Sequence, residues 1–186
     1  MTTAPDPVLQ AVLEAAVDGT GGSDGWLLAV QGDQLQVMAA SSSLASSVMG
    51  TAVPADAGTA GFVMGSGHPI AIALRGDDPR ASTGVAAALG RRPASVLSVP
   101  CHSDDGVAGV LEVVDKAGGG MFTFDDVELA TLLAGIAGVA LAQEGPPRLQ
   151  APTPDEVAGE LRRLAESDSG RYAAVANVLS ALIASG

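Results

Sequence analysis

Short apolar runs separated by turn residues are the feature that most restricts how this chain can fold. The five clearest runs are residues 26–30, 35–38, 69–74, 94–101 and 107–114. They have the length of strands and are rich in Val, Ile, Leu and Ala, and turn sequences separate the first two and the last two. Because strands joined by tight turns pair antiparallel, we expect an antiparallel sheet.

Helical segments lie before and between these runs. Asp6 and Pro7 suit the cap and the first position of a helix, which ends before residues 19–25, where we expect a turn. The Ser-rich residues 41–47 are interpreted as a loop that enters a short helix, and residues 82–89 predict one short helix.

The clearest helix start in the chain is Thr123. Asp126, three residues later, completes a capping box, and Phe122 and Val127 occupy the positions of a hydrophobic staple. We expect this closing helix to continue to Gln143. Strands with helices before and after them predict an α+β domain whose antiparallel sheet is covered on one face.

A Pro-rich segment separates this domain from the end of the chain. We expect residues 1–144 to form the domain, residues 145–154 an extended linker and residues 155–186 a pair of short amphipathic helices. Their apolar stripes are Val157, Leu161 and Leu164, then Tyr172, Val175, Leu179, Leu182 and Ile183. Because helices this short are not stable alone in water, the pair must dock on its own domain, on a second copy or on a protein partner.

The charge of the chain excludes several partners. The net charge is −12, from 21 acidic and 9 basic residues, so phosphate backbones and anionic membranes repel the chain. No apolar run reaches the length of a membrane span, and the first residues lack the pattern of a signal peptide. We therefore expect no nucleic acid, no membrane and a cytoplasmic location. The high Ala and Gly content, with Arg far outnumbering Lys, points to a bacterial source.

A series of motifs between residues 58 and 126 resembles the GAF domain family. In order, they are Gly58-Thr-Ala-Gly-Phe-Val, Ser66-Gly-His-Pro-Ile, Asp77-Asp-Pro-Arg, Ser95-Val-Leu-Ser-Val-Pro, Gly106-Val-Ala-Gly-Val-Leu-Glu-Val-Val-Asp-Lys and Phe122-Thr-Phe-Asp-Asp. The resemblance covers residues 6–143 and rests on the order and spacing of the motifs. It implies a GAF-like (PAS-like) α+β fold, with an antiparallel sheet of five to six strands flanked by helices.

Cyclic-nucleotide-binding GAF domains carry a five-residue signature, and this chain keeps three of its positions. The corresponding residues are Asp115, Lys116, Phe122, Asp126 and Val127, where the family has Asn, Lys, Phe, Asp and Glu. We therefore expect no cyclic nucleotide binding. We expect Lys116 and Asp126 to form an ion pair that holds the last strand against the closing helix, unless Asp126 serves only the capping box.

The residues able to carry chemistry are few. Cys101 is the single cysteine, so it cannot resolve its own sulfenic acid within the chain, and a buried thiol is the favoured interpretation. His68 and His102 have no partners at metal-ligand spacing, and they are interpreted as turn or surface residues. We expect no metal and no bilin, and the scarcity of aromatic residues argues against haem or flavin.

The resemblance implies a non-enzymatic sensory or regulatory module. A ligand pocket would lie between the sheet and residues 58–64 and 80–89. Its candidate contacts are Phe62, Arg75, Arg80, Val85 and Leu89, and the ligand is not specified. The alternatives are an interaction scaffold without a ligand and a Cys101-based enzyme related to free methionine sulfoxide reductases.

The closing helix also predicts a homodimer. Ala130, Ala134, Gly138 and Ala142 recur at steps of four and form a small-residue face on which another helix can approach closely. The alternative is that this face fits the first helix of the same chain. The larger apolar residues on the other faces are expected to cover the sheet: Leu129, Leu132, Leu133, Ile136 and Val139.

Overall fold

The computed structural model describes residues 6–41, 43–74, 78, 84–144, 154–167, 172–173 and 175–176. The chain divides into two units, Met1–Gly145 and Pro146–Gly186. The first unit contains the sheet and all of the motifs described above. The family resemblance therefore falls within a single unit.

Six strands of the described residues form one antiparallel sheet in the order β3-β2-β1-β6-β5-β4. The strands are β1 (Gly22–Gln31), β2 (Gln34–Ala40), β3 (Ala52–Pro54), β4 (Ile70–Ala73), β5 (Ser95–Ser103) and β6 (Gly106–Lys116). The expected antiparallel α+β fold with five to six strands is confirmed. The two central strands are β1 and β6, so the residues of β6 are enclosed by neighbours on both sides.

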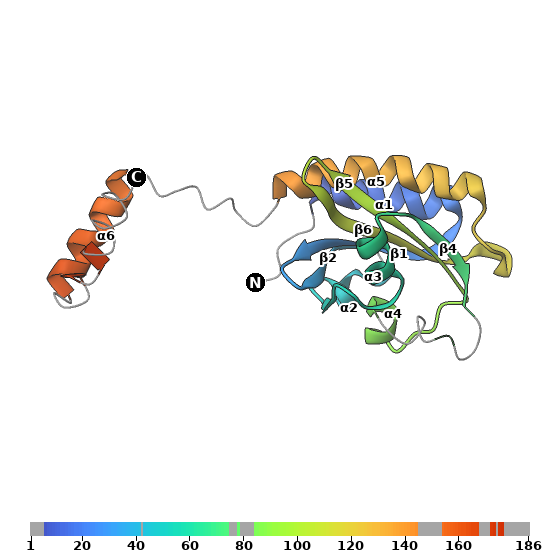
Figure 1. Cartoon of the computed structure of the whole chain (residues 1–186). Helices are drawn as coiled ribbons and strands as arrows, with labels where there is room; N and C mark the ends of the chain where they lie inside the picture. Colours follow the sequence, from blue (N-terminus) through green and yellow to red (C-terminus); the bar gives the residue numbers. More distant parts are fainter. Residues whose placement is uncertain are drawn as a thin grey trace. The chain divides into compact units, whose positions relative to one another are not determined.

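Helices cover both faces of this sheet (Figure 1), not one face as the sequence indicated. Helices α1 (Pro7–Thr20) and α5 (Phe124–Glu144) pack on one side, which we call the long-helix face. Helices α2 (Ala45–Val48), α3 (Gly58–Ser66) and α4 (Gly84–Ala88) lie on the other, the short-helix face. The sequence indicated short helices in this layer but not that they cover the second face, because helices this short do not show a clear apolar period.

Side-chain alternation along the strands builds one apolar core on each face. Leu27 and Leu111 point to the long-helix face and pack with α1 and α5. Trp26, Leu28 and Val110 point to the short-helix face and pack with α3 and α4. The same alternation places Glu112 of β6 on the short-helix face, opposite Trp26 of β1.

The turn expected at residues 19–25 is shorter than predicted. Helix α1 ends at Thr20, the Gly21 that caps it has a left-handed φ of 64°, and β1 already begins at Gly22. A side chain at position 25 would bring Cβ within 2.9 Å of the Glu112 carbonyl oxygen. Glycine here is therefore a strand residue that allows close packing, although glycine in a sequence usually indicates a turn.

The second unit contains helix α6 (Pro154–Ser167), and residues 172–173 and 175–176 are also helical. Leu179, Leu182 and Ile183, from the second predicted stripe, lie outside the described residues. No helix in the described part of the chain combines the length and the apolar composition needed to cross a membrane.

Candidate functional site

Glu112 is the charged residue within the apolar run of β6, and its side chain is buried, with 4% exposed. Three neutral groups donate hydrogen bonds to it. Trp26 Nε1 donates to Oε2 at 2.6 Å, Thr59 Oγ1 donates to Oε1 at 2.6 Å, and Ser98 Oγ donates to Oε1 at 2.5 Å. The carboxylate thereby joins β1, β5 and α3 to β6.

A small cavity lies beside this carboxylate, between the sheet and helices α3 and α4. Its polar lining is Trp26, Thr59 and Glu112, and its apolar lining includes Val85, Val96 and Val114. The cavity volume is about 10 Å³. Since a single water needs about 10–15 Å³, the cavity has room for at most one water-sized group.

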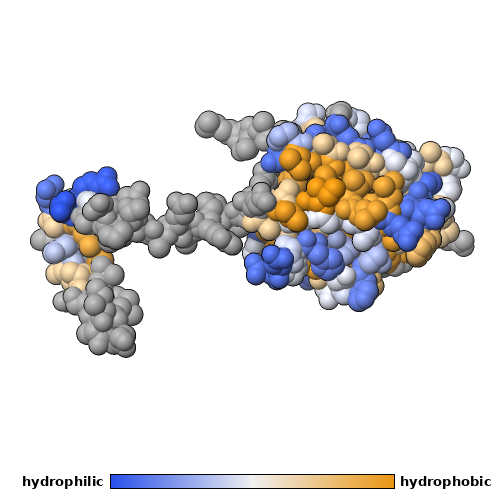
Figure 2. All heavy atoms as spheres, turned by 90° about the horizontal axis from the view of Figure 1, so that it is seen from above, coloured by the Kyte–Doolittle hydropathy of each residue, from blue (hydrophilic) through white to orange (hydrophobic). Residues whose placement is uncertain are grey.

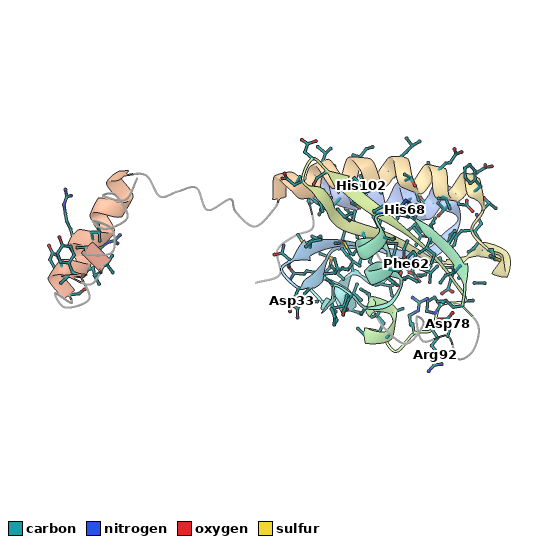
Figure 3. All side chains as sticks on the ribbon, viewed as in Figure 1. Asp33, Phe62, His68, Asp78, Arg92 and His102 are labelled. Atoms are coloured by element: carbon teal, nitrogen blue, oxygen red, sulfur yellow. The ribbon has the colours of Figure 1, made fainter. Side chains whose placement is uncertain are left out.

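Two of the five predicted pocket residues lie beside this cavity or the core around it. Val85 of α4 lines the cavity, and Leu89 packs against the core of the same face. Phe62 of α3 is 51% exposed and does not line the cavity (Figure 3). Arg75 and Arg80 lie outside the described residues. Sequence reasoning missed Glu112, although a single acid in an apolar strand is the signal that would have identified it.

Arg91 connects the segment after α4 to two strands of the sheet. Its Nη1 lies 2.7 Å from Asp24 Oδ2 of β1, and its Nη2 lies 3.5 Å from Asp115 Oδ2 of β6. Asp24 also accepts from Ser43 Oγ at 2.5 Å, and Asp115 accepts from Ala94 N at 2.7 Å. These contacts hold the α4 segment, which forms one wall of the cavity, against the sheet.

Cys101 faces the other side of the sheet. It belongs to the core of the long-helix face and is fully buried. Burial raises the pKa of its thiol to about 12, while a backbone hydrogen bond with Leu111 acts in the opposite direction. Because the thiolate is the nucleophile, this cysteine is unreactive at neutral pH in the folded chain, as expected for a buried thiol.

Both histidines are exposed, and neither belongs to a metal site. His68 is held by Ser66 in the turn that follows α3, and His102 lies on β5 beside Gly138 of α5. The described residues contain no group of three His, Cys, Asp or Glu side chains arranged to hold a metal ion.

The expected ion pair between the last strand and the closing helix is present. Lys116 Nζ lies 2.8 Å from Asp126 Oδ2, and Asp126 also accepts a hydrogen bond from Thr123 N at 2.7 Å, as a capping box requires. The Lys116 ammonium also lies 5.7 Å from the centre of the Phe122 ring. Burial alone would raise the pKa of Asp126, but the hydrogen bonds from Lys116 and Thr123 outweigh burial and lower it.

The small-residue face of α5 is an internal packing surface, which corrects the expected dimer face. Ala130 and Ala134 are fully buried in the chain, and Gly138 lies directly on the backbone of His102. Only Ala142 of the four is exposed. Small residues are needed here because α5 packs closely on β5 and also contacts α1.

Three of the five larger residues of α5 that were expected to cover the sheet form its exposed face instead, whereas Leu133 packs against the core as expected and Leu129 is half-buried. Leu132 is 73% exposed, Ile136 53% and Val139 57%, and Gly135 lies between them with open space around its Cα. The spacing i, i+3, i+4, i+7 places these four residues in one row, which we call the α5 stripe. Phe124, 74% exposed, lies at the start of the same helix. Figure 2, which looks onto this side of the domain, shows a large apolar patch.

Comparison with known proteins supplies the family context. The model of a family described as GAF domain matches residues 2–142. The second GAF domain of DevS from Mycobacterium smegmatis is 22% identical with a TM-score of 0.58, and the match covers 76% of this chain and 95% of that one. The GAF domain of a phosphoenolpyruvate-protein phosphotransferase from Coxiella burnetii is 18% identical with a TM-score of 0.62, covering 76% and 87%.

A third similar structure is an enzyme. Free methionine-R-sulfoxide reductase from Neisseria meningitidis, solved in complex with its substrate, is 18% identical with a TM-score of 0.55, and the match covers 75% of this chain and 81% of that one. Curated proteins gave no match. At these identities the structural matches establish a shared fold.

Proposed function

This chain belongs to the GAF domain family, and we propose that it is a non-enzymatic regulatory module that acts by pairing with a second copy through the α5 stripe. The GAF fold is generally a regulatory or sensory ligand-binding fold, but fold alone does not determine which contact carries the function. The observation that carries the proposal is the row of exposed apolar side chains on α5. Large apolar patches on a soluble surface mark contact sites.

Two features favour a second copy of this chain as the occupant. The net charge of −12 makes two copies repel wherever their acidic surfaces meet, so the contact must form on an uncharged row. The α5 stripe can also pair with itself, because an antiparallel two-fold arrangement centred between Gly135 and Ile136 brings Leu132 of one copy opposite Val139 of the other. Glycine weakens a helix, and a Cβ added at Gly135 would meet no atom of the same chain within 4 Å. The close approach of a second helix would explain why glycine occupies this position.

The small volume of the cavity favours a role in protein–protein contacts and argues against the binding of a large ligand. A volume of about 10 Å³ holds neither a purine nor a tetrapyrrole, in agreement with the departures from the cyclic-nucleotide signature. The buried Cys101 supports the non-enzymatic part of the proposal. A protein partner of the C-terminal helices remains part of the same proposal, since α6, with 14 residues, is too short to be stable alone.

Light scattering of the full chain after gel filtration at micromolar concentration tests the proposal. We expect a dimer for the wild type and a monomer for Ile136→Glu. Pairing of the variant would bury a carboxylate in the interface and bring it close to the same carboxylate of the second copy. Phe62→Glu is the matched control: it also places an acid at an exposed apolar position, but on the short-helix face. A monomeric wild type, or equal dissociation by both variants, contradicts the proposal.

A further inference from the structure

Asp24 is a buried acid of β1 whose two carboxylate oxygens contact two different segments of the chain. The residue is 7% exposed, and strand alternation places it on the same side of the sheet as Trp26. Its Oδ1 accepts a hydrogen bond from Ser43 Oγ at 2.5 Å, in the segment just before α2. Its Oδ2 accepts from Arg91 Nη1 at 2.7 Å, in the segment just after α4. One carboxylate therefore joins residues that are 19 and 67 positions away from it in the sequence.

The two contacts depend on each other because they share one rigid group. The terminal torsion of an aspartate side chain has a broad energy minimum, so a hydrogen bond to one oxygen fixes the direction in which the other oxygen points. Hydrogen bonds to a carboxylate are stronger than those between neutral groups, and the burial of Asp24 leaves little room for water to replace either partner. Loss of the Ser43 contact should therefore weaken the hold on Arg91, and loss of Arg91 should weaken the hold on Ser43.

Each segment also has a second attachment to the sheet. Ser41 Oγ accepts a hydrogen bond from Gly25 N at 2.7 Å, which holds the start of the segment before α2. Asp115 Oδ1 accepts from Ala94 N at 2.7 Å, which holds the end of the segment after α4. Loss of the contacts with the shared carboxylate should therefore loosen the two segments without unfolding them.

We propose that Asp24 is a positioning residue that couples these two segments, so that they loosen and tighten together. Ser43 is exposed, and α4 forms one wall of the cavity. A change at the Ser43 hydroxyl is thereby transmitted to the cavity wall. Both segments border helices of the short-helix face, whereas the α5 stripe lies on the long-helix face, so the coupling and the dimer proposal can fail independently.

Backbone amides on both sides of Asp24 report on this coupling. Leu89 N donates to the Val85 carbonyl at 3.1 Å, and Met49 N donates to the Ala45 carbonyl at 3.1 Å. Neither amide belongs to a residue that touches Asp24. Because such an amide exchanges with solvent when its segment opens, its exchange rate measures the opening of that segment.

Amide exchange in the full chain, measured by NMR, tests the proposal in both directions. Ser43→Ala is expected to accelerate exchange at Leu89 at least about twofold, the low end of coupling within one hydrogen-bond network. Arg91→Gln is expected to accelerate exchange at Met49 by a similar factor. Exchange in α1 should not change, which would show that the domain itself remains intact.

A matched control and a double variant show whether Asp24 carries the effect. Ser47→Ala removes an exposed hydroxyl within α2 itself and should leave exchange at Leu89 unchanged. In the Arg91→Gln background, Ser43→Ala should cause no further acceleration at Leu89, because the connection is already broken. Unchanged exchange at Leu89 in Ser43→Ala, an equal effect of Ser47→Ala, or the same acceleration with and without Arg91 overturns the proposal.

Discussion

The two faces of the sheet differ in what they bury. The long-helix face buries an almost purely apolar cluster under two long helices, with the Cys101 thiol inside it. The short-helix face buries Glu112, Thr59 and Ser98 under helices of four to nine residues and keeps a cavity beside them. Buried polar groups cost stability unless they are fully paired. Helices α1 and α5 also bury Thr20 and Asp126, but neither residue belongs to the apolar cluster of the long-helix face.

The comparison separates an apolar core on one side of the sheet from a buried polar cluster beside a small cavity on the other. On the long-helix face the inner surface of α5 holds the fold together, and its outer surface is available for contact. On the short-helix face short helices, held partly by Arg91, surround a charged group. Perturbations inside the long-helix core should therefore damage stability, whereas perturbations around the cavity should alter local motion.

The largest expected effect is the loss of stability in Gly138→Ala. A Cβ at this position would overlap the carbonyl oxygen of His102, which is backbone and cannot turn away. We expect a loss of about 3 kcal/mol in the free energy of unfolding, at the upper end of overpacking effects, measured by urea denaturation. Gly65→Ala in α3 is the matched control, because its Cβ meets nothing within 4 Å, and it should be neutral or stabilising by up to about 1 kcal/mol. Equal behaviour of the two variants would show that α5 does not pack on β5 as described.

The next effect in size is the loss of the ion pair in Asp126→Asn. Because the folded pKa of Asp126 lies below its ordinary value of 3.8, the carboxylate stabilises the fold above that pH, and the contribution disappears as the pH falls through the folded pKa. We expect Asp126→Asn to cost about 2 kcal/mol at pH 7 and progressively less below pH 3.8, in urea titrations at several pH values. Asp125→Asn, one residue earlier and exposed, should change stability much less. A cost that stays constant from pH 7 to strongly acidic pH would contradict the role of the Lys116 pair.

The smallest expected effect concerns the cavity wall in Arg91→Gln. The arginine side chain is 38% exposed, so solvent screens its ion pairs, and we expect a loss of about 0.5 kcal/mol in global stability. The local effect should be larger: amide hydrogen exchange in residues 84–90 should accelerate, while exchange in α1 should not change. Arg162→Gln, an exposed position in α6 of the other unit, should leave both regions unchanged. Acceleration in α1 as large as in residues 84–90 would show that Arg91 stabilises the whole domain.

The sequence predicted the fold because its evidence is local. Strand length, turn residues and the capping box at Thr123 depend on neighbouring positions. These patterns predicted the strands of the observed sheet and the start of the closing helix. The pairing of Lys116 with Asp126, across the junction of β6 and α5, was predicted from the match of both residues to positions of the family signature. The features that required long-range information, such as the early start of β1 at Gly22, were missed.

The hydrogen-bond partners of Glu112 could not be predicted because they are distant from it in the sequence. Glu112 meets Trp26 across 86 positions and Thr59 across 53, and no local pattern indicates such a meeting. The faces of α5 were only partly assigned correctly, for a related reason. Helix α5 is apolar on several sides, so the periodicity of its apolar residues does not indicate which side is buried. The burial of Ala130 and Ala134 is seen only in the folded structure.

Pairing of two copies across Gly135 is the claim that a single measurement tests most directly. Gly135→Cys places a thiol at the centre of the α5 stripe, and the native Cys101 is fully buried and does not interfere. After mild oxidation at low micromolar concentration, intact mass spectrometry should show a disulfide-linked dimer of twice the 18.3 kDa chain mass. Gly65→Cys, exposed on α3, should remain monomeric under the same conditions. A Gly135→Cys protein that cross-links no faster than Gly65→Cys would contradict an interface on the α5 stripe.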